Sequence, residues 1–371
     1  MKKSLLALAV VAVAASANAA TVYDKDGTSL YLDGRVQSVY YSVNHSGKTA
    51  GENDSTIKNT GRFGVGGKTQ VTDWLAGFGY AQWDVADGSK DEGFTARDQY
   101  VGADFGEFGL VKAGRFVDST YYAEEVTDHY EDAAGTVQGR FNGERRGGQL
   151  QYIYDNYGFH AQAGLQTAQD NARIIDGEKY SVDSGFNGAL GYTFDDVLFG
   201  PLSLRAGYSY LKGQTGNDVD DSFDDNGKPT ATNNGLVFDK SKHATFGISW
   251  GNLNSGFYAA ALYEYQKMTY QDDDNYDKVK GFELAAGYAF DNGVSALVGY
   301  ESVKLSDADD SLKVKRIPVF VNYKINSNFN VWGEVGFNAG SDHKADFDKV
   351  GENYGKKIDK TVFSVGARYT F

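Results

Sequence analysis

The sequence contains no cysteine and only 3 prolines in 371 residues. Without cysteine there can be no disulfide and no thiolate metal site. Few prolines suit long hydrogen-bonded strands, because proline cannot donate to a β-ladder. Beyond a short run near the N-terminus, no apolar stretch approaches the roughly 20 residues of a membrane-spanning helix. A membrane crossing would therefore need a closed barrel of strands, because lipid cannot satisfy open backbone groups.

A basic excess is also absent, since 50 acidic residues outnumber 36 lysines and arginines and give a formal charge of −14. This balance excludes nucleic acid as a partner, because binding to phosphates requires a basic surface. Glycine, tyrosine and phenylalanine are abundant, at 46, 26 and 23 residues. Such a composition is typical of strands that turn tightly and end at a membrane interface.

The N-terminus has the three parts of a secretory signal peptide. Lys2 and Lys3 are followed by an apolar run over residues 5–15 and by the small-x-small site Ala17-Asn18-Ala19. We therefore expect a signal peptide at residues 1–19, a mature charge of −16 and one β-barrel domain at residues 20–371. The alternative for this segment is a buried N-terminal helix.

The rest of the chain alternates between apolar and polar residues with the period of a β-strand. In the last segment, Phe363, Val365 and Ala367 alternate with Ser364, Gly366 and Arg368. The apolar faces carry bulky residues and the polar faces carry small or charged ones, which predicts a greasy outside and a wet inside. We count sixteen such strands, at residues 28–43, 60–72, 74–86, 96–105, 109–116, 145–155, 158–168, 184–195, 202–213, 242–251, 256–268, 278–290, 293–305, 312–325, 328–340 and 359–371.

The breaks between these strands alternate between short turns and long polar segments. This is the pattern of a sixteen-stranded antiparallel transmembrane β-barrel with short periplasmic turns and long external loops. Sixteen strands leave a lumen wide enough for water. The acidic clusters at 218–225 and 272–274 lie in the breaks and do not match a calcium-loop spacing, so we expect no metal site and no cofactor.

Several stretches resemble the general diffusion porins of Gram-negative bacteria. They are residues 20–27 with Leu32-Asp33-Gly34-Arg35, then Arg62-Phe63-Gly64, residues 281–288, and the final Gly366–Phe371 with its C-terminal phenylalanine. The resemblance implies a homotrimer in the cell outer membrane, in contact with lipid and lipopolysaccharide. It also implies that the third external loop folds into the channel and narrows it.

The resemblance implies which residues form this constriction. Acidic residues of the inward loop, at 117–144, would face a basic wall, although Glu131-Asp132-Ala133-Ala134-Gly135 replaces the Pro-Glu-Phe-Gly-Gly stretch of the family. Arginine on a lipid-facing strand costs about 2–4 kcal/mol at mid-membrane, which independently directs strand arginines to the lumen. The wall would consist of Arg35, Arg62, Arg97, Arg115 and Arg145, and the loop would supply Asp128 and Asp132, with Glu131 as an alternative. A second interpretation is that these arginines only hold the loop down.

Three functions are compatible with such a barrel. The first is a passive channel for ions and small hydrophilic solutes, with a weak preference for cations that comes from the acidic loops. The second is a substrate-specific channel, for which Tyr121, Tyr122 and Tyr130 would form an aromatic path. The third, a barrel enzyme, is disfavoured because none of the five histidines adjoins a nucleophile-elbow sequence. We therefore expect a channel and not an enzyme.

Overall fold

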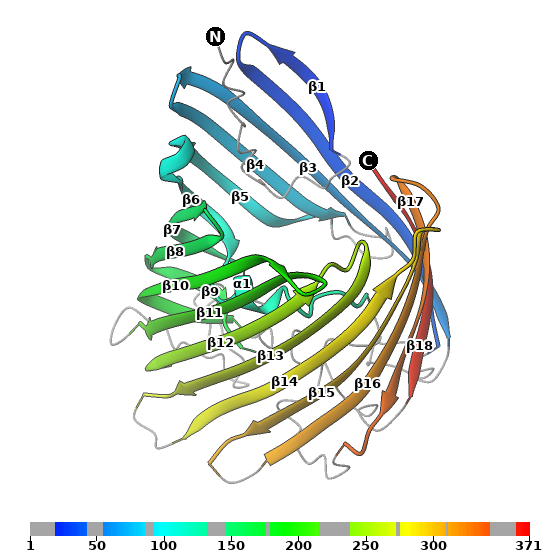
Figure 1. Cartoon of the computed structure of the whole chain (residues 1–371). Helices are drawn as coiled ribbons and strands as arrows, with labels where there is room; N and C mark the ends of the chain where they lie inside the picture. Colours follow the sequence, from blue (N-terminus) through cyan, green and yellow to red (C-terminus); the bar gives the residue numbers. More distant parts are fainter. Residues whose placement is uncertain are drawn as a thin grey trace.

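The computed structural model describes residues 19–42, 55–85, 93–131, 145–175, 179–214, 238–271, 275–308, 311–341 and 361–371. Sixteen antiparallel strands close into a barrel (Figure 1), as the alternation predicts. Neighbours in sequence pair with each other, and the pairs β8–β10 and β18–β2 complete the ring. The strands are β2 Thr28–Tyr41, β3 Thr56–Thr72, β4 Leu75–Val85, β5 Phe94–Asp104, β6 Leu110–Val117, β7 Arg145–Asn156, β8 Phe159–Gln166, β10 Lys179–Val197, β11 Gly200–Gly213, β12 Lys240–Gly251, β13 Gly256–Thr269, β14 Tyr276–Ala289, β15 Val294–Ser306, β16 Ser311–Lys324, β17 Phe329–Asn338 and β18 Val362–Thr370.

Two short strands, β1 (Ala20–Lys25) and β9 (Gln169–Arg173), are additions that the alternation did not predict. β9 pairs with the first residues of β10, beyond the stretch of β10 that pairs with β8. It therefore lengthens the barrel wall at the end opposite the short turns. The chain also forms a 3₁₀ turn η1 (Gly106–Phe108) and one helical turn α1 (Tyr121–Glu124). Among the described residues there is no helix with the length and apolarity needed to cross a membrane.

The two ends of the barrel domain meet on one edge of β2. β1 pairs with residues 28–32 of this strand, and β18 pairs with residues 35–41. Between them, Gly34 exchanges two backbone hydrogen bonds of 2.9 Å with Phe371. A side chain at position 34 would lie 2.6 Å from the Phe371 ring, so glycine is required for this joint. β1 and β18 therefore act together as one strand of the ring.

The outer surface is apolar and the inner surface is mostly polar. Large apolar side chains on the outer face remain exposed, among them Val36, Leu190, Phe246, Tyr263, Val321 and Val365. Positions between them carry polar residues that are buried inside the barrel, such as Asp33, Gln37, Asn187 and Thr245. This is the arrangement that lipid outside and water inside require.

Turn lengths differ between the two ends of the barrel, as predicted. The turns at one end are short: residues 73–74, 105–109, 157–158, 198–199, 252–255, 290–293 and 325–328. At the other end, the longest intervals between strands are 117–145, 213–240 and 338–362. The short turns mark the periplasmic end and the long intervals mark the external end.

The interior is drier than the sequence suggested. At the external ends of β10 to β16, inner positions carry buried apolar residues that cluster beneath residues 172–175 and Phe238. The segments that fold back over this part of the wall exclude water, so apolar residues occupy both faces there. The expectation of a wet inner face along the full length of the strands is therefore wrong at this end. The inner-face members of the cluster include Val182, Leu211, Met268, Val279, Val303, Leu305, Leu312 and Val314.

The outer surface offers a direct test of the barrel's orientation. Leu190, near the middle of β10, is 58% exposed and lies opposite Ala161 and Ala206. Leu190→Arg should lower the free energy of unfolding in phospholipid vesicles by about 2–4 kcal/mol, because it places a charge in hydrocarbon. Urea titration followed by tryptophan fluorescence measures this loss, with Leu190→Phe as an apolar control. Equal stability of Leu190→Arg and the wild type would contradict a lipid-facing position.

Candidate functional site

The chain turns into the barrel directly after β6. We call residues 118–131 the inward segment; it contains α1, which lies within the ring of strands in Figure 1 and packs against β11 and β12. Its first residue, Asp118, is 2% exposed. The Asp118 carboxylate accepts hydrogen bonds from Arg146 of β7 and from Ser209 of β11, the latter at 2.8 Å. This buried ion pair fixes the point at which the chain leaves the wall.

The backbone of the inward segment is then held by side chains of the wall. Thr245 of β12 donates to the carbonyl of Thr120 at 3.1 Å, and Tyr258 of β13 donates to the carbonyl of Val126 at 2.6 Å. Arg205 of β11 donates to the Tyr122 carbonyl at 3.0 Å and also binds the Glu125 carboxylate. These bonds satisfy carbonyls that would otherwise be buried without a partner.

Glycines in the wall allow this close approach. A Cβ at Gly207 of β11 would lie 2.7 Å from the Thr120 Cα. A Cβ at Gly247 of β12 would lie 2.5 Å from the Ala123 carbonyl oxygen. Both contacts are with backbone, which cannot rotate away as a flexible side chain can. The inward segment therefore fits against the wall only where the strands lack side chains.

The inward segment reaches β16 to β18 at its far end. The Tyr130 ring packs edge-on against Phe320 of β16, with 6.4 Å between the ring centroids. Glu131 forms a two-point ion pair with Arg368 of β18, one contact being 2.8 Å, and its backbone N–H donates to Glu334 of β17 at 2.6 Å. The segment thus runs along the inner wall from β10 to β18.

The predicted basic wall lies on strands away from this path. Arg62 of β3 and Arg97 of β5 both bind Asp84 of β4, each at 2.9 Å. Arg145 of β7 binds Asp98 of β5 at 3.0 Å. The described carboxylates that pair with these three arginines are therefore on strands and not on the inward segment.

Arg35 adds positive charge to this group. It lies directly opposite Arg62 in the β2–β3 ladder, and both side chains are on the inner face. Within the described residues, no carboxylate forms an ion pair with Arg35. Arg115 lies on β6 opposite Gln99, one position from the fully buried Phe116.

The predicted acidic residues of the loop are in three different situations. Glu131 binds Arg368, as described above. Asp128 accepts a hydrogen bond from the Tyr121 hydroxyl, and burial together with the Asp128 charge raises the pKa of Tyr121, so this phenol remains a donor. Asp132 lies outside the described residues.

Sequence reasoning missed the carboxylates of the wall. Asp84 continues the inner alternation of Tyr80 and Gln82, so its position could have been found from the pattern. Asp98 could not, because strict alternation places it on the face opposite to Arg97. A bulge in β5 sets both residues against Gln82 and turns both inward, where Arg97 also donates to Gln82 at 3.2 Å.

Residues 5–255 match the model of the family described as Gram-negative porin. Outer membrane porin F of Salmonella typhi is 28% identical over 370 residues, which cover 91% of this chain and 93% of that protein. Outer membrane porin PhoE of Escherichia coli K12 is 27% identical over the full length of both chains.

Solved structures share the fold. Salmonella typhi OmpF in complex with daunomycin superimposes with a TM-score of 0.71 at 23% identity, covering 95% of this chain and 100% of that one. An anion-selective porin from Comamonas acidovorans gives a TM-score of 0.64 at 17% identity, covering 93% and 100%. The family match, the full-length relatives and the closed barrel agree: this chain belongs to the Gram-negative porins, and its place is the outer membrane.

Proposed function

We propose that this porin is a general diffusion channel through which ions and small hydrophilic solutes pass passively, with a weak preference for cations. The observation that carries the proposal is the inner charge arrangement. Arg35, Arg62, Arg97 and Arg145 lie on β2, β3, β5 and β7, and the inward segment lines the inner wall from β10 to β18. Solutes would pass between these two sides, through a charged and hydrated aperture.

The weak selectivity follows from charge compensation. Asp84 is shared by two arginines, and Asp98 and Glu131 each neutralise one more. These three carboxylates offset most of the charge of Arg35 and the four paired arginines, while the whole chain carries a formal charge of −14. Acidic external segments raise the cation concentration at the channel mouth, and the arginines oppose this effect.

The alternative of an aromatic path for a specific substrate receives no support from the three tyrosines. Tyr121 donates to Asp128, Tyr122 stacks on His160 with 3.9 Å between ring centroids, and Tyr130 packs on Phe320. All three side chains hold the inward segment in place. A general channel needs no further aromatic contact with the solute.

Reversal potentials in a salt gradient across planar bilayers test the aperture. The wild type should give ohmic channels with a weak cation preference. Asp128→Asn with Asp132→Asn should shift selectivity towards anions, and so should Asp84→Asn, which leaves two arginines uncompensated. Arg62→Gln with Arg97→Gln should shift it towards cations and enlarge the conductance.

Asp26→Asn serves as the control, because Asp26 lies in the exposed turn between β1 and β2 and should leave selectivity unchanged. Absence of conductance from folded protein would overturn the channel function. Unchanged selectivity in all three variants would instead show that these residues do not form the aperture.

The position of the inward segment can be tested separately. Gly247→Val should push the segment away from β12 and into the lumen, because its side chain would overlap the Ala123 carbonyl. Single-channel conductance should fall in this variant. Gly333→Val is the matched control, since a Cβ at Gly333 of β17 meets no atom within 4 Å. Equal conductance in the two variants would contradict the contact between segment and wall.

We further propose that the protein is a homotrimer whose external rim binds lipopolysaccharide. The trimer rests on the family resemblance and on the relatives named above. The removal of residues 1–19 also remains a proposal, because residues 1–18 lie outside the described part of the chain. Contact with lipopolysaccharide has support from the surface itself.

Lysines line the outer face near the external ends of β11 to β16. Lys242, Lys267 and Lys278 are directly opposite one another across three strands, and Lys280, Lys304 and Lys313 form a second row. Like charges in register destabilise a sheet unless an anion lies between them. Among the described residues, Asp183 forms an ion pair with Lys212 and Asp239 forms one with Lys240, and both pairs lie at one end of this surface. Phosphate groups of lipopolysaccharide would compensate the two rows.

Replacement of Lys242, Lys267 and Lys278 by glutamine should weaken binding of lipopolysaccharide at least tenfold and leave binding of its dephosphorylated form unchanged. Titration of detergent-solubilised protein measures both affinities. Lys25→Gln with Lys324→Gln is the control, because both lysines lie at the short-turn end. An equal loss in the control, or none in the triple variant, would contradict a lysine site.

A further inference from the structure

Three potential metal ligands meet where the inward segment contacts the wall. They are Glu124 of α1, His243 of β12 and Glu264 of β13, and one ligand atom from each lies within 4.8 Å of the others. The His243 Nε2 atom is 3.4 Å from a Glu264 oxygen and 4.0 Å from a Glu124 oxygen. In the described part of the chain, no other group of His, Cys, Asp and Glu has this geometry.

The cluster is fully enclosed by protein. Glu124 and Glu264 are 0% exposed and His243 is 7% exposed. The Glu264 Oε1 atom is buried and has no hydrogen-bond partner among the described residues. A buried carboxylate oxygen without a donor is costly unless a cation or a proton compensates it.

Arg146 lines a cavity together with His243, but its guanidinium is bound to Asp118. Further along the inner wall, Glu283 and Glu301 are directly opposite each other and buried, and only Arg316 lies in register with them. This part of the wall therefore has more buried carboxylates than cationic side chains.

We propose that Glu124, His243 and Glu264 bind a divalent first-row transition metal ion, with Zn²⁺ as the first candidate. Bonds of 2.0–2.1 Å in a tetrahedral site place ligand atoms about 3.3 Å apart. The separation between His243 and Glu264 already matches this value, and Glu124 needs to move by about 1 Å. One imidazole and two carboxylates form a donor set that suits Zn²⁺ better than Ca²⁺ or Mg²⁺.

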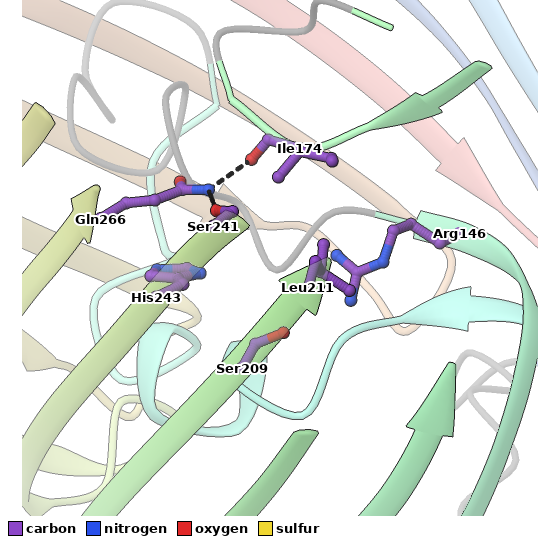
Figure 2. Close-up of a pocket in the computed structure, with 7 residues that line it drawn as sticks. All are labelled: Arg146, Ile174, Ser209, Leu211, Ser241, His243 and Gln266. Atoms are coloured by element: carbon purple, nitrogen blue, oxygen red, sulfur yellow. Dashed lines mark hydrogen bonds between the residues drawn. The ribbon is translucent and has the colours of Figure 1, made fainter. Parts of the chain in front are cut away.

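A small cavity lies on one side of the cluster, where His243 lines it but Glu124 and Glu264 do not. It measures about 10 Å³, which is close to the space that one water molecule requires. Ser209, Ser241, Gln266 and the Arg146 side chain line it together with Ile174 and Leu211 (Figure 2). Gln266 donates to the Ile174 carbonyl at 3.0 Å and to Ser241 at 3.1 Å, which fixes this side of the cavity. A water molecule in this cavity would therefore have polar partners beside His243.

The ion would join the inward segment to two strands at once. Glu124 belongs to the segment, whereas His243 and Glu264 belong to the wall. Binding to the folded barrel but not to the unfolded chain would raise stability by mass action. No local pattern indicates this site, because Glu124 and His243 lie 119 positions apart and no ligand motif connects them.

The experiment measures metal binding and stability in the purified, detergent-solubilised protein, so its outcome does not depend on transport. Protein stripped with a chelator and dialysed against Zn²⁺ should retain one ion per chain. Its thermal unfolding temperature should rise with added Zn²⁺. Co²⁺ should substitute and give the visible absorption of a four-coordinate site with nitrogen and oxygen ligands.

His243→Gln and Glu264→Gln should each lower the affinity for Zn²⁺ at least tenfold and remove the stabilisation. Glu301→Gln is the control, because Glu301 is also a buried inner-wall carboxylate but lies on β15 outside the cluster. Wild-type protein that retains no Zn²⁺ and shows no Co²⁺ absorption would overturn the proposal, even if a variant failed to fold. Retention of one ion by both folded variants would place the metal elsewhere and would overturn it as well.

Discussion

Every backbone amide and carbonyl in the hydrocarbon layer must find a partner within the protein, because lipid offers none. In this porin a ring of strands meets the requirement, and the ring closes where the two ends of the barrel domain meet. β2 carries that junction, since it binds β1 along one part of its edge and β18 along the rest. The position of the inward segment depends on this closed wall.

The wall in turn determines where the inward segment can lie. A buried ion pair with β7 at one end and a partly buried ion pair with β18 at the other hold the segment, and glycines on β11 and β12 leave space for its backbone. Removal of one partner from a buried pair such as Asp118–Arg146 leaves the other charge unpaired, which is costly. The arginines of β3, β5 and β7 have carboxylate partners within the wall and are therefore positioned independently of the segment.

The strands could be predicted from the sequence because a barrel wall has two contrasting faces and the alternation repeats along the chain. The alternation did not predict β1 and β9. β1 continues the place of β18 along the edge of β2, and β9 continues the place of β8 along the edge of β10, and no local sequence pattern indicates such a continuation. Arg62 and Arg97 both bind Asp84, a shared partner that the sequence analysis did not identify. The Glu131–Arg368 contact joins residues 237 positions apart, and the bulge at Asp98 changes the face of a single residue. Such features depend on the assembled barrel and not on the alternation of apolar and polar residues along a strand.

The junction at Gly34 and Phe371 has a consequence for biogenesis. The bonds that close the ring join Gly34 to Phe371, so the ring cannot form before Phe371 has been synthesised and exported. Until that moment both β2 and β18 present open edges, which readily pair with other chains. Contacts between residues so distant in sequence also form slowly. An incomplete barrel therefore exposes two strand edges to pairing with other chains, and this exposure ends only when Phe371 reaches Gly34.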